Sequence, residues 1–251
     1  MRKFHGTVKK IITKKCVPIT KQKVKLFDVS IGRFGDIHNY ELSGIGEVTG
    51  IDPDKDSIEE ALKRYNNMKS KYKINAIISK QTISDKKINI TNILYDIVAC
   101  NFTLHYLFET EEFLINTLKN ISSRLKQNGY FIGTTIDGDK LEQLHSNNDI
   151  FFETCKNFGE KDISFGKQYK FNLMDTKDSG NYFDKHIQKD LEYRVSIKVF
   201  TEYASRYGLK LLEYKPFEEY EYDRTKFSKN EKLISSLYGS FIFIKTPYQK
   251  D

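Results

Sequence analysis

Short apolar runs separated by helical patterns fill the first half of the chain. Residues 97–100 are apolar without alternation, which is typical of a strand covered on both faces. Four further runs predict strands over 24–29, 48–51, 75–78 and 130–135. We therefore expect five strands before residue 136.

Two amphipathic helices are predicted between these strands. The first has apolar residues at i, i+3, i+4 and i+7 over 58–68, and Ser57 with Glu60 forms a capping box at its start. The second begins after Thr110, which can cap it, and ends at Asn128–Gly129, a left-handed cap. Because strands and helices alternate, we expect an α/β fold with a mostly parallel central sheet and right-handed crossovers.

The two ends of the chain have a less regular pattern. Val8, Ile11 and Ile12 can anchor a short helix in the basic N-terminal segment, and Asp139 can cap another short helix. The second half predicts extended segments over 165–173, 191–195, 209–214 and 240–245 and a helix over 198–207. We expect the last two strands to pair antiparallel at the edge of the sheet.

Length and composition predict one domain of 251 residues, made of a basic segment (1–23), a cofactor-binding half (24–135) and a substrate-binding half (136–251). No apolar run approaches the ~20 residues that span a bilayer, and the N-terminus lacks the apolar core of a secretory signal. Three distant cysteines without metal-ligand spacing indicate a reducing compartment. The net charge of +7 favours a polyanionic partner such as RNA, although such a charge is often only a solubility device.

The first two strands carry the signal of a nucleoside site. The first ends in Asp28 and runs into a turn with two glycines, and Asp52 follows 24 residues later at the end of the second strand. A carboxylate there can accept two hydrogen bonds from the vicinal diol of a ribose. We expect Phe34 to hinder the approach of a diphosphate, which favours S-adenosylmethionine over a dinucleotide.

A cluster of polar and aromatic side chains follows the strand over 95–100. Asn101, Phe102, His105 and Tyr106 come at its carboxyl end, where open α/β sheets bind their ligands. Such residues suit a flat, charged ring. The alternative is a strand end whose aromatic rings only pack.

The run from 101 to 141 resembles the central block of the mRNA cap guanine-N7 methyltransferases. It is most similar to the branch found in poxvirus and African swine fever virus capping enzymes, where a TT-x-DGDKL run like that at 134–141 occurs. The resemblance extends to 5–15, 50–68 and 236–245, and so over nearly the whole chain. It implies a Rossmann-like class I S-adenosylmethionine-dependent methyltransferase fold.

The resemblance also implies where the cofactor binds. Lys9 matches a lysine that reaches the methionine carboxylate, Asp52 matches the ribose-binding acid, and Gln81 falls near an aspartate that meets the adenine. Ser30 and Phe34 depart from the family, which commonly has glycines there. The full predicted cofactor set is Lys9, Asp28, Ser30, Gly32, Gly35, Asp36, Asp52, Gln81, Asn101 and Phe102.

The cap guanine is expected to bind to a second set of residues. Phe102, His105 and Tyr106 match the family's F-x-x-HY signature, and Glu192 matches the glutamate that holds the guanine edge. The resemblance adds Phe171 and Tyr238 as aromatic residues of this pocket, and we expect Arg33 at its rim to meet the triphosphate bridge. Since guanine N7 already carries a lone pair, His105, Tyr106 and Glu192 should position it, and none should act as an acid or base.

The implied activity is methyl transfer from S-adenosylmethionine to N7 of the cap guanine of viral mRNA, with S-adenosylhomocysteine as the product. The alternatives are a silent cap- or RNA-binding module, and a methyltransferase for a small molecule or another RNA position. Expected partners are GpppN-RNA, triphosphatase and guanylyltransferase domains in cis or in trans, and a stimulatory subunit, with no membrane. The chain could be the C-terminal domain of a longer capping enzyme, and the resemblance implies the host cytoplasm, in a viral factory or virion.

Overall fold

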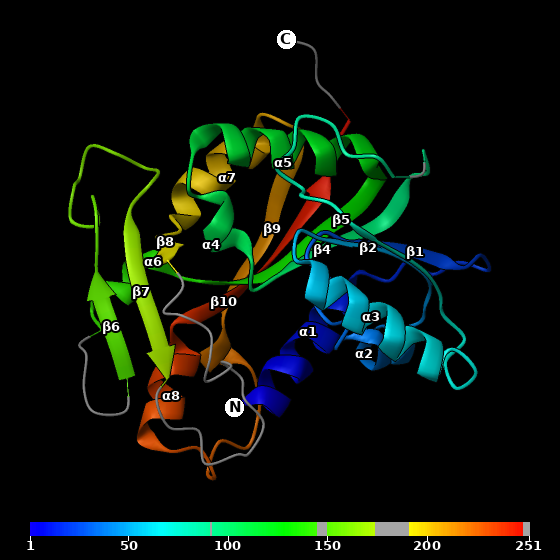
Figure 1. The fold of residues 1–251 in the computed structure, drawn as a ribbon, viewed down its shortest axis with the longest axis horizontal. Coiled ribbons are helices and arrows are strands. Elements are labelled where there is room, and N and C mark those ends of the chain that lie inside the picture. Colours follow the sequence, from blue (N-terminus) through cyan, green and yellow to red (C-terminus); the bar gives the residue numbers. More distant parts are fainter. Residues whose placement is uncertain (91, 145–149, 174–190, 248–251) are drawn as a thin grey trace.

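The computed structural model describes residues 1–90, 92–144, 150–173 and 191–247, and its centre is a seven-stranded sheet (Figure 1). In sheet order the strands are β3 (Asn75–Lys80), β2 (Ile45–Asp52), β1 (Val24–Asp28), β4 (Tyr95–Asn101), β5 (Leu125–Ile136), β10 (Tyr238–Lys245) and β9 (Leu209–Pro216). The five strands from β3 to β5 pair in parallel, whereas β10 is antiparallel to both of its neighbours. This confirms the α/β fold, the mostly parallel sheet and the antiparallel final pair.

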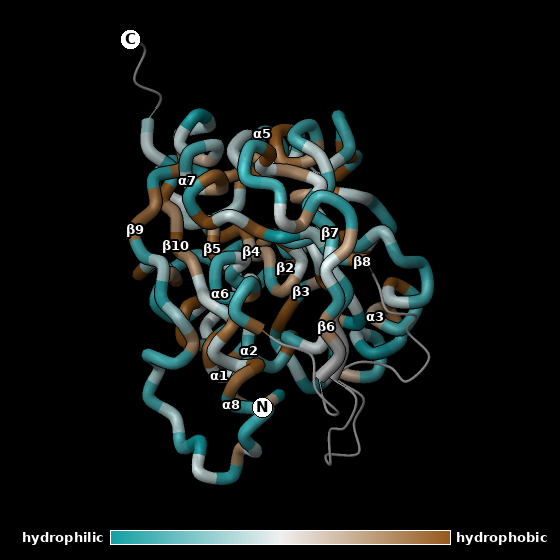
Figure 2. Tube along the Cα trace, turned by 90° about the vertical axis from the view of Figure 1, so that its left-hand side faces the viewer, coloured by the Kyte–Doolittle hydropathy of each residue, from teal (hydrophilic) through white to brown (hydrophobic). Residues whose placement is uncertain are grey.

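Alternate residues of the central strands enter two separate cores. In β4, Val98 and Cys100 face one core while Ile97 and Ala99 face the other, and all four are inaccessible to solvent. This two-sided burial explains the continuous apolar run. In Figure 2 the hydrophobic colour accordingly gathers on the inner strands, while the outer loops are largely hydrophilic.

Helices cover both faces of the sheet (Figure 1). One face packs against α1 (Arg2–Cys16), α2 (Ile37–Leu42) and α3 (Lys55–Met68), and the other against α4 (Leu104–Leu107), α5 (Glu111–Arg124) and α7 (Ile197–Ser205). The N-terminal helix is therefore part of the core, with Val8 and Ile12 buried, although Ile11 remains 39% exposed. No helix of the described ranges is long and apolar enough to cross a bilayer.

A smaller antiparallel sheet stands beside the carboxyl ends of β4 and β5 (Figure 1). Its strands are β6 (Ile150–Thr154), β7 (Gln168–Leu173) and β8 (Leu191–Tyr193), in that order. A third apolar cluster joins it to α6 (Gly138–Leu141) and α8 (Lys229–Ser236), and a short 3-10 helix, η1 (Phe217–Glu219), follows β9. The second half of the chain thus builds one wall of the candidate site.

Three predicted helix ends are wrong. The α3 helix begins at Lys55 and is capped by Asp54, whose carboxylate accepts from the Ser57 amide, so the Ser57–Glu60 box does not form. The α5 helix is capped by Thr110 as predicted, but it ends at Arg124. Asn128 does adopt a left-handed φ of 60°, yet it lies inside β5. The cap of α6 is Asp137, which accepts from the amide of Asp139.

Candidate active site

The order of the strands places the candidate site. The chain proceeds outward from β1 through β2 to β3, and then returns to place β4 on the other side of β1. In open α/β sheets, ligands bind at the carboxyl ends of the strands where the order reverses in this way. Asp28 ends β1 and Asn101 ends β4, and Asp28 pairs in register with Ala99. Both residues therefore lie at the expected crevice.

The turn after β1 is held by Asp52 at the end of β2. The two carboxylate oxygens of Asp52 accept from the amides of Gly32 (2.9 Å) and Asp54 (3.0 Å), which leaves further lone pairs on each oxygen. Gly32 has a φ of 49°, and a Cβ built there would meet no atom within 4 Å. The turn is thus open at Gly32, and Asp52 can still accept from a ligand diol.

Lys9 links the two predicted halves of the site. Its ammonium is 2.6 Å from a carboxylate oxygen of Asp36 and 5.6 Å from the centre of the Phe102 ring. The side chain is only 18% exposed, so Lys9 is not a solvated residue of a basic tail. A carboxylate ligand beside Lys9 would lie between the β1 turn and the aromatic residues that follow β4.

Asp28 is a buried carboxyl group beneath this crevice. It accepts from the hydroxyl of Tyr40 (2.7 Å) and from the amide of Ser30 (3.1 Å). Burial raises the pKa of Asp28 to about 7, an effect that these hydrogen bonds and Lys9 oppose and that Asp36 reinforces. Asp28 therefore changes its charge near neutral pH.

Aromatic side chains from distant segments surround the end of β4. Phe102 has a φ of 58°, which is unusual for a residue with a side chain, and its amide donates to the carbonyl of Thr134. Its ring meets the edge of Tyr238 at 5.3 Å and lies 6.2 Å from Phe217. Phe102 and Tyr238, both predicted for the cap pocket, are therefore in contact.

Glu192 reaches the same region from β8. It pairs in register with Tyr169 of β7, whose hydroxyl donates to Glu192 at 2.6 Å. The other carboxylate oxygen of Glu192 lies 3.8 Å from Nε2 of His105, which is too long for a hydrogen bond. Burial lowers the pKa of His105, against the attraction of Glu192, so the imidazole is neutral at physiological pH. Glu192 thus keeps one oxygen available to an incoming donor.

Tyr106 and His105 follow Phe102 on the short helix α4. The two rings lie 4.1 Å apart between centroids, and His105 is buried while Tyr106 is 42% exposed. The F-x-x-HY run therefore presents one buried and one accessible ring beside Glu192.

Several predicted site residues have other surroundings. Gln81 donates to Ser79 and Asn89 and accepts from the amide of Asn89, so its amide group organises the loop after β3. Arg33 is exposed. The pKa of Asp54 is lowered mainly by hydrogen bonds with Ser57, and the charge of Arg33 adds to this effect, which places Arg33 beside β2 and α3. The roles of Gln81 at the adenine and Arg33 at the triphosphate stay predictions.

The other loop and pocket residues are placed as follows. Gly35 is exposed, and Asn101 accepts from Thr134 at 3.4 Å. Phe171 lies in β7 opposite Phe152, and its side chain is outside the described part of the structure. The Phe34 side chain is fully buried, with its ring centroid 6.3 Å from that of Tyr65. Because the ring points into the core, the expectation that it hinders the approach of a diphosphate is wrong.

Three residues of the site were missed in the sequence. Tyr40 bonds Asp28, Tyr169 bonds Glu192, and His5 stacks on Phe102. No local pattern marks them, because each becomes a partner only through the pairing of segments that are distant in the chain.

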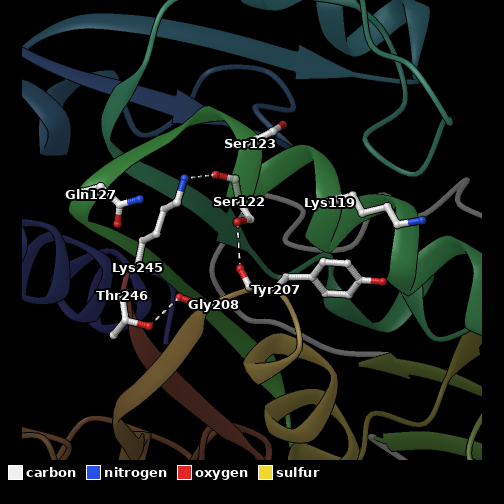
Figure 3. A pocket seen from close by; sticks show the side chains of 8 residues that line it. All are labelled: Lys119, Ser122, Ser123, Gln127, Tyr207, Gly208, Lys245 and Thr246. Carbon is white, nitrogen blue, oxygen red and sulfur yellow. Dashed lines mark hydrogen bonds between the residues drawn. The ribbon is translucent and has the colours of Figure 1, made fainter. Parts of the chain in front are cut away.

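A cavity of about 430 Å³ lies near the starts of β5 and β9, at the other end of these strands from the candidate site (Figure 3). The Lys245 ammonium there donates to the carbonyls of Ser122 and Leu125 at the end of α5, and the Ser122 hydroxyl donates to the Tyr207 carbonyl. These groups satisfy one another, so the cavity is lined by structural hydrogen bonds.

The fold defines the class of protein. An S-adenosylmethionine-dependent methyltransferase from Clostridium acetobutylicum matches with a TM-score of 0.63 and 15% identity, over 97% of this chain and 91% of that one. A putative one from Listeria monocytogenes matches with a TM-score of 0.61 and 16% identity, over 96% and 98%. The chain has the class I S-adenosylmethionine-dependent methyltransferase fold.

The family follows from the sequence. Residues 1–241 match the mRNA (guanine-N(7))-methyltransferase domain, and the chain belongs to that family. It is 28% identical over 243 residues to the mRNA cap guanine-N(7) methyltransferase of Saccharomyces cerevisiae, covering 88% of this chain and 53% of the yeast protein. The Schizosaccharomyces pombe enzyme is 26% identical over 257 residues, covering 95% and 65%. The chain thus spans about half to two thirds of these relatives, which are fungal, and nothing in these matches points to a viral branch.

The residues present fit S-adenosylmethionine. Asp52 would accept from the ribose hydroxyls, the open turn at Gly32 gives the ligand access to the backbone, and Lys9 would meet the methionine carboxylate. When bound, S-adenosylmethionine supplies a methyl group on a positively charged sulfur, which is already activated for transfer.

Binding of this cofactor should tighten as the pH rises toward 7. The cofactor has a net positive charge and favours ionised Asp28, so below the pKa of about 7 its binding must release a proton. We expect Kd to fall by up to ~10-fold per pH unit below neutrality and then to level off. Calorimetry between pH ~5.5 and ~8.5 measures this trend. His5 does not titrate in that range, because burial lowers its pKa to about 3.

The Asp28→Asn variant is the control for this prediction. An amide keeps an acceptor for the Tyr40 hydroxyl but cannot ionise, so the slope below neutrality should disappear. A wild-type affinity that does not change with pH would contradict the role of Asp28.

Proposed function

We propose that this chain methylates N7 of the guanine in the GpppN cap of mRNA, with S-adenosylmethionine as the donor. The observation that carries the proposal is the position of Glu192. Its carboxylate is held by Tyr169, and one oxygen remains available beside His105, Tyr106 and the aromatic residues that follow β4. Guanine N1–H and its exocyclic amine are neighbouring donors that such a carboxylate can accept.

The reaction requires no general base from the protein. Bound S-adenosylmethionine would supply a methyl group that the N7 lone pair can take up directly, with the carbon–sulfur bond electrons left on sulfur and the positive charge passed to the purine. The chain's residues contribute orientation and electrostatics. Glu192 is negative and accepts more strongly as the purine becomes cationic, while burial lowers the pKa of His105 and so prevents a competing positive charge.

The direct test is transfer of a labelled methyl group to GpppG-RNA by the isolated chain, with m7GpppG-RNA as the matched control. We expect label on the first RNA only. A chain that binds GpppG-RNA but not S-adenosylmethionine would be the silent cap-binding module. Labelling of m7GpppG-RNA would indicate methylation at another position.

Tyr106→Ala should weaken the binding of capped RNA while leaving the fold intact. The ring is 42% exposed and adjoins His105, so its loss removes a stacking surface but little core. Base stacking on an aromatic residue is worth about 1–3 kcal/mol, so we expect the KM for capped RNA to rise by at least ~5-fold. Phe113→Ala, which removes a 36% exposed ring from α5, is the control. Equal KM values for the two variants would contradict stacking on Tyr106.

The proposed viral origin, location and partners rest on the motif resemblance alone. The TT-x-DGDKL run at 134–141 supports an origin in a capping enzyme of a large DNA virus, and with it viral mRNA as the substrate and the host cytoplasm as the location. The coverage of the fungal relatives is compatible with a domain of a longer protein. Triphosphatase and guanylyltransferase partners, and a stimulatory subunit, are part of the same proposal.

A further inference from the structure

His5 is buried at the centre of the aromatic residues near the candidate cap pocket. It comes from α1, and only 1% of its surface is exposed. Its ring stacks on Phe102 at 5.5 Å with an interplanar angle of 24°, and it contacts Tyr238 at 5.4 Å and Phe217 at 5.1 Å. His5 therefore touches two of the aromatic residues predicted for the cap pocket, Phe102 and Tyr238.

A hydrogen bond fixes the orientation of this ring. Nε2 of His5 lies 3.3 Å from the hydroxyl of Ser235, which is buried on α8 just before β10 and Tyr238. Burial, reinforced by the positive N-terminus and Lys9, lowers the pKa of His5 to about 3. The imidazole is therefore neutral, and its plane is determined by both the stacking and the hydrogen bond.

Phe102 needs such support from its surroundings. A φ of 58° is unfavourable for a residue with a side chain and persists only where neighbouring contacts hold it. His5 covers one face of the ring, and Tyr238 meets it edge-on. Without His5, the left-handed conformation of Phe102 would lose its stacked neighbour.

We propose that His5 is a positioning residue. Through ring stacking and its hydrogen bond with Ser235, it holds Phe102 and Tyr238 in the orientation that contacts guanine. The N-terminal helix α1 is then part of the cap site as well as of the cofactor site, to which it contributes Lys9. This inference rests on the proposed function, since it assigns a role in the binding of that substrate.

The test compares binding of GpppG and of S-adenosylmethionine by calorimetry, with thermal unfolding measured for every variant. His5→Ala should raise the Kd for GpppG about tenfold and leave that for S-adenosylmethionine within about twofold. His38→Ala, which removes a more exposed histidine of α2, is the matched control and should change neither.

Two conservative variants test the hydrogen bond itself. His5→Phe keeps a stacking ring but loses the partner of Ser235, and Ser235→Ala removes the same bond from the other side. Each should raise the Kd for GpppG by about threefold, and the double variant should be no worse than either, because both remove one interaction. Additive effects would overturn the role of this bond.

The outcomes separate the two proposals. The role of His5 is overturned, and the proposed function stands, if the wild-type chain and His5→Ala bind GpppG equally well. The same conclusion follows if His5→Ala raises the Kd for S-adenosylmethionine at least as much as the Kd for GpppG. If the wild-type chain binds no GpppG, both are overturned. Should His5→Ala fail to fold, His5→Phe and Ser235→Ala decide the question.

Discussion

Glu192→Ala is expected to lower kcat/KM for capped RNA by at least ~100-fold. The carboxylate is held by Tyr169, and in the proposed function its other oxygen would accept from guanine. Guanine N–H donors that lose their acceptor in a buried site cost binding free energy. The expected cofactor site lies at the ends of β1 and β2, away from Glu192, so the Kd for S-adenosylmethionine should not change. Initial rates of methyl transfer to GpppG-RNA provide the measurement.

Two companion variants separate chemistry from stability. Glu192→Gln keeps an oxygen that can accept from the Tyr169 hydroxyl, so its thermal unfolding should match the wild type while its activity is still lost. Glu153→Ala removes a half-exposed carboxylate from β6, which β7 separates from β8 in the small sheet, and should leave the rate unchanged. Near wild-type rates for Glu192→Gln would rule out recognition of guanine by this carboxylate.

The part of the site that could be predicted from the sequence is the part built by local connections. Asp28 and Asp52 follow directly from the ends of two apolar runs, and a parallel sheet brings adjacent strand ends together. The F-x-x-HY run lies within one turn after β4, so its residues also stay together. In these cases the ends of adjacent parallel strands, or a short spacing after one strand, were enough to place the side chains.

Contacts between distant segments could not be predicted in the same way. Tyr169 meets Glu192 only because β7 pairs with β8 in one register, and a shift of one residue would turn Tyr169 to the other face. His5 reaches Phe102 because α1 packs against β5 and β10 on the face of the sheet that η1 also covers. Neither the alternation of residues in a strand nor the periodicity of a helix predicts these two contacts.

The errors at helix ends have a related cause. Both Asp54 and Ser57 can cap a helix, and both Asp137 and Asp139 can do so a few residues after a strand. The choice depends on where the preceding strand stops, and β2 remains paired with β3 as far as Asp52. The first suitable acceptor after the strand, Asp54, then becomes the cap.

Asp52→Asn should raise the Kd for S-adenosylmethionine by roughly 30- to 100-fold. The carboxylate accepts from two backbone amides, and its remaining lone pairs would accept from a ribose diol. The side chain of asparagine keeps one accepting oxygen, but its NH2 group faces one of the two backbone N–H groups that Asp52 accepts from. Both the turn at Gly32 and the ribose contact should therefore be weakened. Calorimetry with S-adenosylmethionine measures the loss directly.

The control for this variant is Asp56→Asn, an exposed acid in the first turn of α3 that changes the net charge equally. It should bind the cofactor as the wild type does. At saturating S-adenosylmethionine, Asp52→Asn should recover most of its activity with an unchanged KM for capped RNA, because Glu192 and the aromatic pocket are intact. A variant that instead lost affinity for capped RNA, with cofactor binding preserved, would show that Asp52 serves the other half of the site.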